Sequence, residues 1–393
     1  MHNPAASPRP QACAVILAGG LSSRMGGPLK PLLRLAGQTA LARLAATFRQ
    51  AGVADIIVAG GHRQAEIAAE AERLGIRFVY NPYYETGMFS TVQAGLAGLA
   101  AVPPAAERVL LTPADVPLFR PATVTRLLAR ATEPGTSGAP PVLYPAFAGE
   151  RGHPPCLDAA LLPAILAFDG DGGLRAALAP YPFEELPVAD ALTLADMDTP
   201  ADYAALNVLA ARLDIPTPAE AEALLAIQAV PPQGLAHARG VAAVALALAR
   251  GLNSAGAGLD LSLIEAAALL HDVAKGQPRH EAAGGRLLDS LGFSRAGAIV
   301  AAHRDIELPP DAPVTEREIV YLADKFVYGS RLVSVPARFG QKLDLFAQDP
   351  EAVAAITRRR RNAMAVLARV EQALPCPVAE VLAETGLLPA GPP

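Results

Sequence analysis

Residues 17–31 read LAGGLSSRMGGPLKP and overlap the end of an apolar run, CAVILA, at residues 13–18. A run without polar residues favours a strand that is buried on both faces of a parallel sheet. Glycines after such a strand let backbone N–H groups approach an anion closely, and a following helix adds its positive end. Arg24 and Lys30 place two cations beside this bare backbone. The stretch therefore predicts a phosphate-binding loop at the end of a strand.

The spacing of the glycines excludes two familiar phosphate loops. No Ser or Thr follows Lys30, and the stretch does not match the G-x-G-x-x-G pattern. For the loop taken alone, a tight turn with incidental cations is the alternative. The neighbouring segments of the sequence have to decide between a phosphate-binding loop and a tight turn.

Short apolar runs alternate with helical segments from residue 11 to about residue 205. The runs cover 13–18, 55–61, 76–81 and 108–117, and segments with helical period cover 38–52, 63–75, 90–101 and 122–132. This alternation predicts βαβ units and a parallel sheet with both faces covered by helices. We assign residues 11–205 to this α/β domain.

The strand signals stop after residue 205. Thr217, Pro218 and Glu220 form the pattern of a helix N-terminus with a capping box. Helical period then recurs over 235–252, 260–274, 279–292, 295–304 and 315–329. We predict a linker at 206–216, an all-α domain at 217–375 and a frayed C-terminal tail at 376–393.

The composition narrows the class of protein. Of 393 residues, 52% are hydrophobic and 18% charged, so a packed core is easy to build. A net charge of −5 argues against a nucleic-acid partner, and the basic run at 358–362 is expected to be a solvated helix face. Three widely spaced cysteines suit a reducing compartment. The sequence shows no secretory signal and no apolar stretch of the roughly 18 residues that a membrane span needs, so we predict a cytoplasmic protein without a membrane partner.

Two aspartates follow extended segments of the first domain. Asp115 lies in LLTPADVP and Asp198 in DMDTPADY. In an open α/β sheet, ligands bind beyond the carboxyl ends of the strands. A lone carboxylate there is more often a helix cap, but two of them opposite a phosphate loop predict a Mg²⁺ site.

Six segments in order resemble the molybdenum cofactor nucleotidyltransferases, most of all the cytidylyltransferases. They are LAGGLSSRMGGPLKPL, NPYYETGMFSTVQAGL, PADVPLF, GERGHPPCL, DGDGGLRAAL and DMDTPADY, within residues 13 to about 205. The resemblance implies a Rossmann-like fold of the nucleotide-diphospho-sugar transferase type. It also implies transfer of a nucleoside monophosphate from CTP or GTP to the terminal phosphate of molybdopterin, with release of pyrophosphate. A target molybdoenzyme is a further partner that this activity suggests.

The resemblance also assigns site residues. It gives the triphosphate to Gly19, Gly20, Arg24 and Lys30, Mg²⁺ to Asp115 and Asp198, the nucleotide to Gly87 and Ser90, and the pterin side to His153 and Asp171. Charge neutralisation on the leaving pyrophosphate makes Arg24, Lys30 and Asp115 the expected catalytic residues. For His153, a loop histidine satisfied by local hydrogen bonds is an equal alternative. Cytidylyl members usually read LAAG where this chain has LAGG, a guanylyl feature; the other segments favour CTP.

The helical half concentrates histidines and aspartates. His271 and Asp272 end an apolar helix, where unpaired polar groups are costly. A lone His–Asp pair is more often structural, but further candidates accompany it: His237, His280, His303 and Asp324. Imidazole with carboxylate suits a divalent transition metal.

The order His237, His271-Asp272, Asp324 resembles the HD-domain metal-dependent phosphohydrolases. The resemblance implies that these residues bind one metal ion, Mn²⁺ or Fe²⁺, and that His280 and His303 support a second. Lys275 would contact a substrate phosphate, and a metal-activated water would attack a phosphoester. Binding of a nucleotide or partner without turnover is the alternative for this domain.

Two alternatives apply to the chain as a whole. One keeps the nucleotidyltransferase fold with another acceptor, such as a sugar phosphate. The other is a protein that holds the pterin cofactor and senses nucleotide with little turnover.

Overall fold

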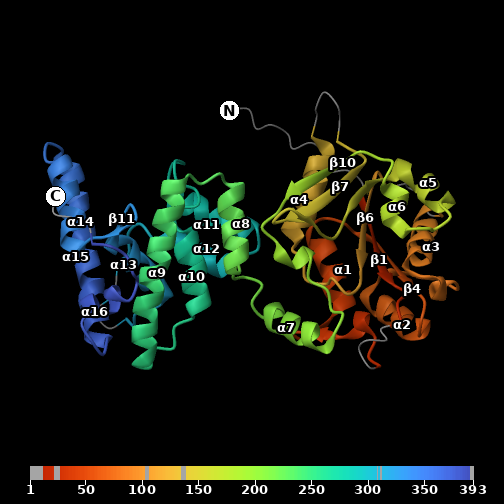
Figure 1. The fold of residues 1–393 in the computed structure, drawn as a ribbon, viewed down its shortest axis with the longest axis horizontal. Helices are drawn as coiled ribbons and strands as arrows, with labels where there is room; N and C mark the ends of the chain where they lie inside the picture. Colours follow the sequence, from red (N-terminus) through yellow and green to blue (C-terminus); the bar gives the residue numbers. More distant parts are fainter. Residues whose placement is uncertain are drawn as a thin grey trace. The chain divides into compact units, whose positions relative to one another are not determined.

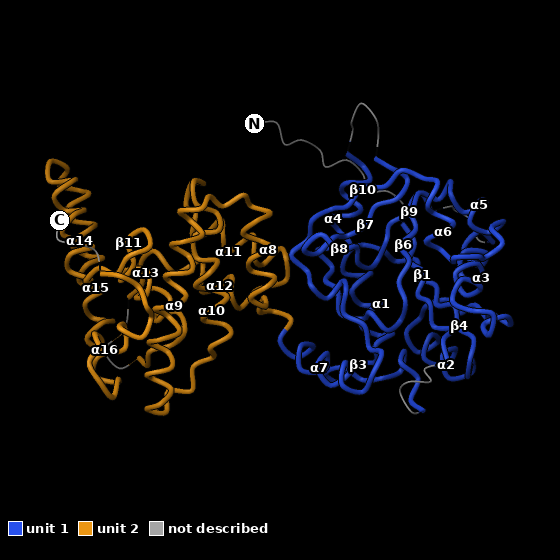
Figure 2. The backbone as a smooth tube through the Cα atoms, viewed as in Figure 1, with its two compact units in different colours: residues 1–212 blue, residues 213–393 orange. Residues whose placement is uncertain are grey.

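The computed structural model describes residues 12–21, 27–101, 106–133, 139–307, 309 and 312–389. The chain divides into two compact units, residues 1–212 and 213–393 (Figure 2). Each unit is described by itself below.

The first unit is built on an eight-stranded sheet with the order β10-β7-β9-β6-β1-β4-β5, in which β8 pairs with β7. The strands are β1 Ala12–Ala18, β4 Asp55–Gly60, β5 Arg77–Tyr80, β6 Arg108–Pro113, β7 Val142–Phe147, β8 Glu150–Arg151, β9 Cys156–Asp158 and β10 Phe183–Pro187. The strands β6-β1-β4-β5 run parallel, as predicted. β9, however, is antiparallel to both β6 and β7, so the sheet is mixed and not purely parallel.

Helices cover both faces of this sheet (Figure 1). One layer holds α1 Ala40–Gln50, α2 Gln64–Leu74 and α4 Pro121–Thr132; the other holds α3 Met88–Ala100, α5 Leu162–Ala167 and α6 Gly173–Leu178. Successive side chains of a strand point to opposite faces. In β1, Ala14 and Ile16 therefore pack with the first layer, whereas Val15 and Leu17 pack with the second. This double burial is why the strand is a continuous apolar run.

Shorter elements connect these layers. They are η2 Lys30–Leu32, β2 Arg34–Leu35, β3 Gln38–Thr39, η3 Tyr84–Thr86, η4 Ala159–Leu161 and η5 Ala191–Thr193. Helix α7 Pro200–Ala210 begins at a capping box between Thr199 and Asp202 and ends within the predicted linker, which is therefore partly helical.

In the part of the chain that the structure describes, the second unit is helical except for one hairpin and an isolated bridge between Leu332 and Pro389. Its helices are α8 Pro218–Ile227, α9 Pro232–Ser254, α10 Leu261–Leu270, α11 His280–Ser290, α12 Ser294–Ala302, α13 Glu316–Phe326, α14 Val335–Leu345, α15 Pro350–Ala373 and α16 Val378–Ala383. The predicted capping box of Thr217 and Glu220 is confirmed at the start of α8. The expectation of an all-α unit is wrong in one detail, because β11 Val327–Tyr328 pairs with β12 Arg331–Leu332.

Helix α9 forms the centre of the second unit, where it packs against α10, α13 and α16. Among the described residues it is the one helix long and apolar enough to cross a membrane, and 61% of its most apolar window is buried inside the unit. Such burial is what a core helix requires.

The segment assigned to a frayed tail is partly ordered. It contains α16, and an added Cβ on Gly251 of α9 would lie 3.7 Å from Val381. The backbone N–H of Leu332 also donates to Leu388 O at 3.0 Å. Apolar contact with α9 therefore extends the second unit beyond residue 375.

Candidate functional sites

Lys30 lies between the two predicted metal-binding carboxylates of the first unit. Its Nζ is 2.9 Å from Asp115 Oδ2 and 2.6 Å from Asp198 Oδ1. Two backbone bonds bring these distant segments together: Ala114 N–H donates to Leu17 O at 3.0 Å, and Met197 N–H donates to Asp115 O at 2.9 Å. The end of β1, the end of β6 and the segment before α7 therefore meet at one place.

The carboxylates beside Lys30 are candidate ligands for a metal cation. Burial alone would lower the pKa of Lys30, but its bonds to Asp198 and Asp115 outweigh burial and raise that pKa. A third carboxylate, Asp196, has a raised pKa because it is partly buried and faces the charges of Asp198 and Asp115. Among the described residues, the carboxylates of Asp115, Asp196 and Asp198 lie at this place, and carboxylate oxygens are the donors that Mg²⁺ prefers.

Asp196 was missed in the sequence, although a signal for it exists. It lies two residues before Asp198 in the non-helical stretch between η5 and α7. Residues two apart in an extended segment lie on the same side, so the spacing D-x-D predicts two carboxylates facing one site.

A cleft of about 1040 Å³ opens beside these carboxylates. Asp115, Asp196, Asp198 and His153 line it. His153 Nδ1 is buried and has no hydrogen-bond partner among the described residues. Burial lowers the pKa of His153, opposed by the nearby charge of Asp115. A neutral imidazole nitrogen beside the carboxylates is thus available to a ligand.

Several predicted site residues lie outside the lining of this cleft. Of the described residues assigned by resemblance, these are Gly19, Gly20, Lys30, Gly87, Ser90 and Asp171, although Lys30 contacts the lining residues Asp115 and Asp198. Ser90 Oγ lies 2.8 Å from Gly87 O and accepts from Asn81 Nδ2 at 2.9 Å, which ties the loop to the start of α3. Asp171 is exposed, whereas the adjacent Gly172 and Gly173 do line the cleft. Arg24 lies outside the described residues.

The opposite part of the cleft lining was not predicted. It includes Tyr144, Arg151 and Glu185. Arg151 Nε lies 2.6 Å from Glu185 Oε1, and its guanidinium lies 5.2 Å from the centre of the Tyr144 ring. Tyr144 and Glu185 come from β7 and β10, in which no motif marks them, whereas Arg151 of β8 lies in the segment GERGHPPCL without an assigned role.

Gly19 has a packing reason to be glycine. A Cβ at this position would lie 2.3 Å from the buried Thr91 Oγ1, a group that also accepts from Asn81 Nδ2 at 3.0 Å. Gly20, by contrast, has no atom within 4 Å of an added Cβ.

We expect Gly19→Ala to destabilise the first unit by about 1–3 kcal/mol, because Thr91 must move to admit the methyl group. Gly20→Ala is the matched control and is expected to have little effect. The midpoint of chemical unfolding measures both. Thr91→Ala added to Gly19→Ala should recover part of the loss; equal destabilisation by the two glycine variants would contradict the packing argument.

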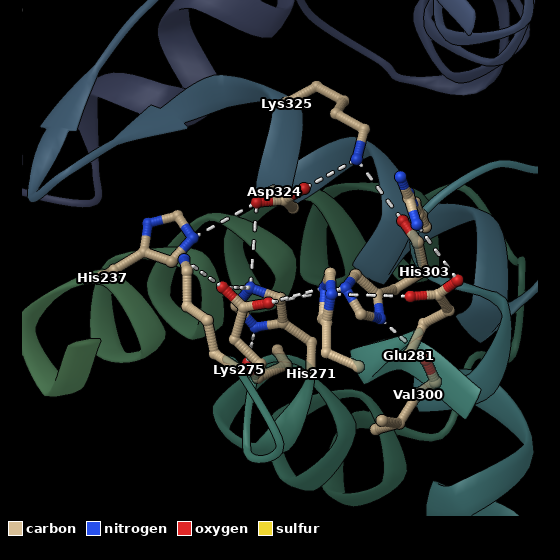
Figure 3. A network of polar contacts seen from close by, with 12 residues as sticks. His237, His271, Lys275, Glu281, Val300, His303, Asp324 and Lys325 are labelled. Carbon is tan, nitrogen blue, oxygen red and sulfur yellow. Dashed lines mark hydrogen bonds and ion pairs between the residues drawn. The ribbon is translucent and has the colours of Figure 1, made fainter. Parts of the chain in front are cut away.

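Six side chains of the second unit form a ring of imidazoles and carboxylates (Figure 3). Their sources are α9 for His237, the residues after α10 for His271 and Asp272, the start of α11 for His280, the end of α12 for His303, and α13 for Asp324. The structure thus brings together every residue that the sequence nominated for this site.

A lysine binds one oxygen of each carboxylate in the ring. Asp324 Oδ1 lies 3.2 Å from His237 Nε2 and 3.7 Å from His271 Nε2, while its Oδ2 lies 2.6 Å from Lys325 Nζ. Asp272 Oδ1 lies 3.2 Å from His280 Nε2, and its Oδ2 lies 2.6 Å from Lys275 Nζ. Asp272 Oδ2 also lies 3.7 Å from His271 Nε2, so both oxygens of this carboxylate face the histidines.

Backbone carbonyls fix the orientation of three imidazoles. The Nδ1 atoms of His271 and His303 lie 2.7 Å from Ala268 O and Val300 O, and that of His237 lies 3.1 Å from Gly329 O. A carbonyl can only accept, so Nδ1 carries the proton and Nε2 offers its lone pair to the centre.

The ring meets the requirements of a metal centre. The groups His237-His271-Asp272 and Asp272-His280-His303 each bring their ligand atoms within 4.8 Å of one another and share Asp272. His271 Nε2 is buried without a hydrogen-bond partner among the described residues. Burial would raise the pKa of Asp324, but the charge and the hydrogen bond of Lys325 hold it well below its usual range. Neutral imidazoles and ionised carboxylates are the protonation states that metal ions need.

Comparison with known proteins identifies the first unit. Residues 14–191 match the MobA-like NTP transferase domain. The molybdenum cofactor guanylyltransferase of Rhodopseudomonas palustris (strain HaA2) is 34% identical over 226 residues, which cover 54% of this chain and 96% of that protein. The chain belongs to the MobA-like NTP transferase family.

Other relatives of this MobA-like NTP transferase carry different names. The nicotine blue oxidoreductase of Paenarthrobacter nicotinovorans is 31% identical, over 48% of this chain and 93% of that protein. The bifunctional protein GlmU of Azorhizobium caulinodans is 39% identical over 29% of this chain. The matched part spans only about 25% of the length of GlmU. The solved structure of Rv0371c from Mycobacterium tuberculosis H37Rv is 26% identical, with a TM-score of 0.42, and covers 51% of this chain and 100% of that one.

The MobA-like NTP transferase domain is followed by a second domain in the same chain. Residues 234–329 match the HD domain. This range contains the whole ring of histidines and aspartates, whereas the range 14–191 contains Lys30 and Asp115 but ends before Asp198.

The HD domain of this MobA-like NTP transferase should lose stability in mild acid when no metal is bound. Burial lowers the pKa of His271 from 6.5 to about 4. Between pH 6.5 and pH 4, His271 is protonated in the unfolded chain but stays neutral in the folded state. Stability is therefore full above pH 6.5 and falls as the pH drops towards 4, by about 3 kcal/mol at 1.36 kcal/mol per pKa unit.

Unfolding of EDTA-treated protein, followed by helical circular dichroism between pH 7 and pH 4.5, measures this loss. His271→Asn keeps a side-chain amide near Ala268 O but does not titrate, so its pH slope should be smaller. Equal slopes for the two proteins would contradict the assignment to His271.

Proposed function

We propose that the first unit transfers CMP from CTP to the terminal phosphate of molybdopterin and releases pyrophosphate, in the cytoplasm. The observation that carries this proposal is the position of Lys30 between Asp115 and Asp198 at the edge of the cleft. Lys30 would neutralise charge on the triphosphate, and Asp115 and Asp198 would hold Mg²⁺. The bound ion supplies further neutralisation of the leaving pyrophosphate.

The acceptor phosphate itself is the nucleophile in this proposal, so the protein needs to supply only position and charge. The acceptor oxygen attacks the α-phosphorus, and the bond to the bridging oxygen of pyrophosphate breaks. Tyr144, Arg151 and Glu185 line the cleft with an aromatic face and paired charges, which suits a flat heterocycle with donors and acceptors on its edge. A sugar-phosphate acceptor would use less of this surface.

The packing of Gly19 is relevant to whether the first unit uses CTP or GTP. Because Thr91 excludes a methyl group at position 19, the glycine in LAGG has a structural cause that is independent of the nucleotide. The other cytidylyl-like segments therefore favour CTP. GTP is the second candidate, favoured by the relatives named molybdenum cofactor guanylyltransferase.

Pyrophosphate release from CTP, GTP, ATP and UTP, with Mg²⁺ and molybdenum-loaded molybdopterin, tests the proposal. Release with CTP and not with GTP is the expected result. Release with GTP alone would reverse the base assignment. Release with none of the four would overturn the transferase proposal for this acceptor, and a screen of sugar phosphates would follow.

We further propose that the HD domain hydrolyses a phosphoester with the help of two divalent metal ions, Mn²⁺ or Fe²⁺. His237, His271, Asp272 and Asp324 would hold the first ion, and Asp272, His280 and His303 the second. A bound ion supplies a water of lowered pKa as nucleophile. Lys275, whose side chain is exposed beside Asp272, would meet the substrate phosphate.

Metal content per chain and hydrolysis of p-nitrophenyl phosphate by the Mn²⁺-loaded full chain test this second proposal. About two ions per HD domain and measurable hydrolysis are expected. Bound metal without hydrolysis of this or any other phosphoester would favour the binding role, and absence of metal would overturn the site.

A further inference from the structure

Helix α14 carries two cations on one face, Arg338 and Lys342, which are four residues apart. The helix packs against α13, the source of Asp324, and against α15. Among the described residues, no carboxylate forms an ion pair with either Arg338 or Lys342. The two charges therefore lie together without an acidic partner.

Arg338 contacts a residue that adjoins the ring of candidate metal ligands. Its guanidinium carbon lies 4.9 Å from the centre of the Tyr328 ring. The next residue, Gly329, accepts a hydrogen bond from His237 Nδ1 at 3.1 Å. Arg338 Nε is buried and has no hydrogen-bond partner among the described residues. The guanidinium of Arg338 thus contacts Tyr328, the neighbour of the residue whose carbonyl orients the candidate metal ligand His237.

Lys342 lies one turn after Arg338 on α14. Its side chain is exposed, so a solute can reach it. Desolvation by surrounding atoms and the charges of Arg338 and Lys325 hold the pKa of Lys342 below its ordinary value, while the charge of Asp324 acts in the opposite direction. Lys342 is therefore within electrostatic reach of the ring carboxylate Asp324.

A third cation, Arg359 of α15, acts on Lys342 as well. Its Nε is also buried without a hydrogen bond, at 3.6 Å from Asp305 Oδ2. Like charges gathered at partly desolvated positions repel each other. A phosphate group would remove this repulsion, and guanidinium and ammonium groups bind phosphate through charge-assisted hydrogen bonds.

We infer that Arg338 and Lys342 form a second phosphate subsite beside the metal ring, so that the HD domain takes a substrate with two linked phosphates. One phosphate would lie at the ring and the other on α14. The inference rests on the proposed hydrolytic function and adds its substrate class, a phosphoanhydride. Inorganic pyrophosphate, the product proposed for the first unit, and nucleoside diphosphates share this chemistry.

The reaction balances with water alone. Water oxygen forms a bond to one phosphorus as the bridging P–O bond breaks. The leaving phosphate keeps the electron pair of that bond and takes up a proton. No oxidant, reductant or further co-reactant is required.

The first test measures binding in the metal-loaded full chain without turnover. Titration calorimetry compares methylenebisphosphonate, which cannot be hydrolysed, with methylphosphonate, which has one phosphorus. Arg338→Met with Lys342→Met should weaken binding of the bisphosphonate about tenfold or more and binding of methylphosphonate less than threefold. Metal content should not change. The difference between variant and wild type cancels any binding to the first unit.

Arg360→Met with Arg361→Met is the matched control, because it removes two exposed cations of α15 that are not among the main influences on the pKa of Lys342. It should leave both affinities unchanged. Equal weakening of the two ligands by the α14 variant, or no weakening, would overturn the inference. Equal losses of affinity in the α14 variant and in the control would attribute the effect to net charge alone. This result would also overturn the inference.

The second test measures phosphate release from inorganic pyrophosphate, CDP and p-nitrophenyl phosphate. Faster hydrolysis of pyrophosphate or CDP than of the monoester, reduced at least tenfold in the α14 variant, supports the inference, and the faster of the two identifies the source. Hydrolysis of the monoester alone overturns the inference but leaves the proposed phosphohydrolase in place. Hydrolysis of none of the three contradicts the proposed function itself.

Discussion

Replacing Asp272 with alanine is expected to remove both metal ions from the HD domain at once. Its carboxylate belongs to both groups of candidate ligands, and its Oδ1 lies 3.2 Å from His280 Nε2 and 3.6 Å from His303 Nε2. The metal content of this domain should fall from about two ions per chain to near zero. Phosphoester hydrolysis should fall by about 10²–10³-fold or more, the scale of losing a principal stabiliser of transition-state charge.

Two variants make this expectation specific. Asp289→Ala removes an exposed carboxylate of α11 outside the ring and should keep both ions. His280→Ala removes a ligand of only one group and should retain about one ion. Retention of two ions by Asp272→Ala, with the helical circular dichroism unchanged, would contradict a shared carboxylate.

Replacing Asp115 with alanine is expected to lower nucleotidyl transfer by about 10²–10³-fold while the triphosphate still binds. Lys30 keeps Asp198 as a partner at 2.6 Å, so the fold should tolerate the change. Pyrophosphate release measures turnover, and calorimetric titration with CTP measures affinity. Glu133→Ala, at an exposed carboxylate after α4, is the control and should leave both unchanged.

This variant also separates an enzyme from a cofactor-binding protein. An enzyme that uses Asp115 to hold Mg²⁺ loses turnover much more than affinity. A binding protein with slow background turnover would show a similar small loss in both. Similar small losses of turnover and of CTP affinity would contradict the assignment of nucleotidyl transfer to this site.

The fold class could be predicted because burial leaves a direct mark on the sequence. The apolar runs of β1 and β6 mark strands covered on both faces, and the glycine loop after β1 places them in an α/β unit. The strands β7, β9 and β10 could not be predicted in the same way. β10 contains Glu184 and Glu185, β9 has only three residues, and their pairing depends on contacts across the sheet.

The candidate sites were predictable as sets of residue types and not as geometries. The order of His237, His271-Asp272 and Asp324 indicates a metal centre through its resemblance to the HD-domain family, whereas a lone His–Asp pair does not. Nothing in the sequence shows that Lys325 holds Asp324, since adjacent residues in a helix do not ordinarily face each other. The base preference of the transferase stays a prediction from motifs.

The long separation between Lys30 and its partners has a consequence for synthesis. Asp198 is 168 residues after Lys30, and Asp115 is 85 residues after it. A ribosome releases the chain from its N-terminus, so Lys30 emerges long before Asp198 exists. The nucleotide site therefore cannot close until nearly the whole first unit has been translated, and a triphosphate cannot guide the earlier steps of its folding. The histidines and aspartates of the HD domain all lie within residues 234–329, so they are translated after Lys30, Asp115 and Asp198.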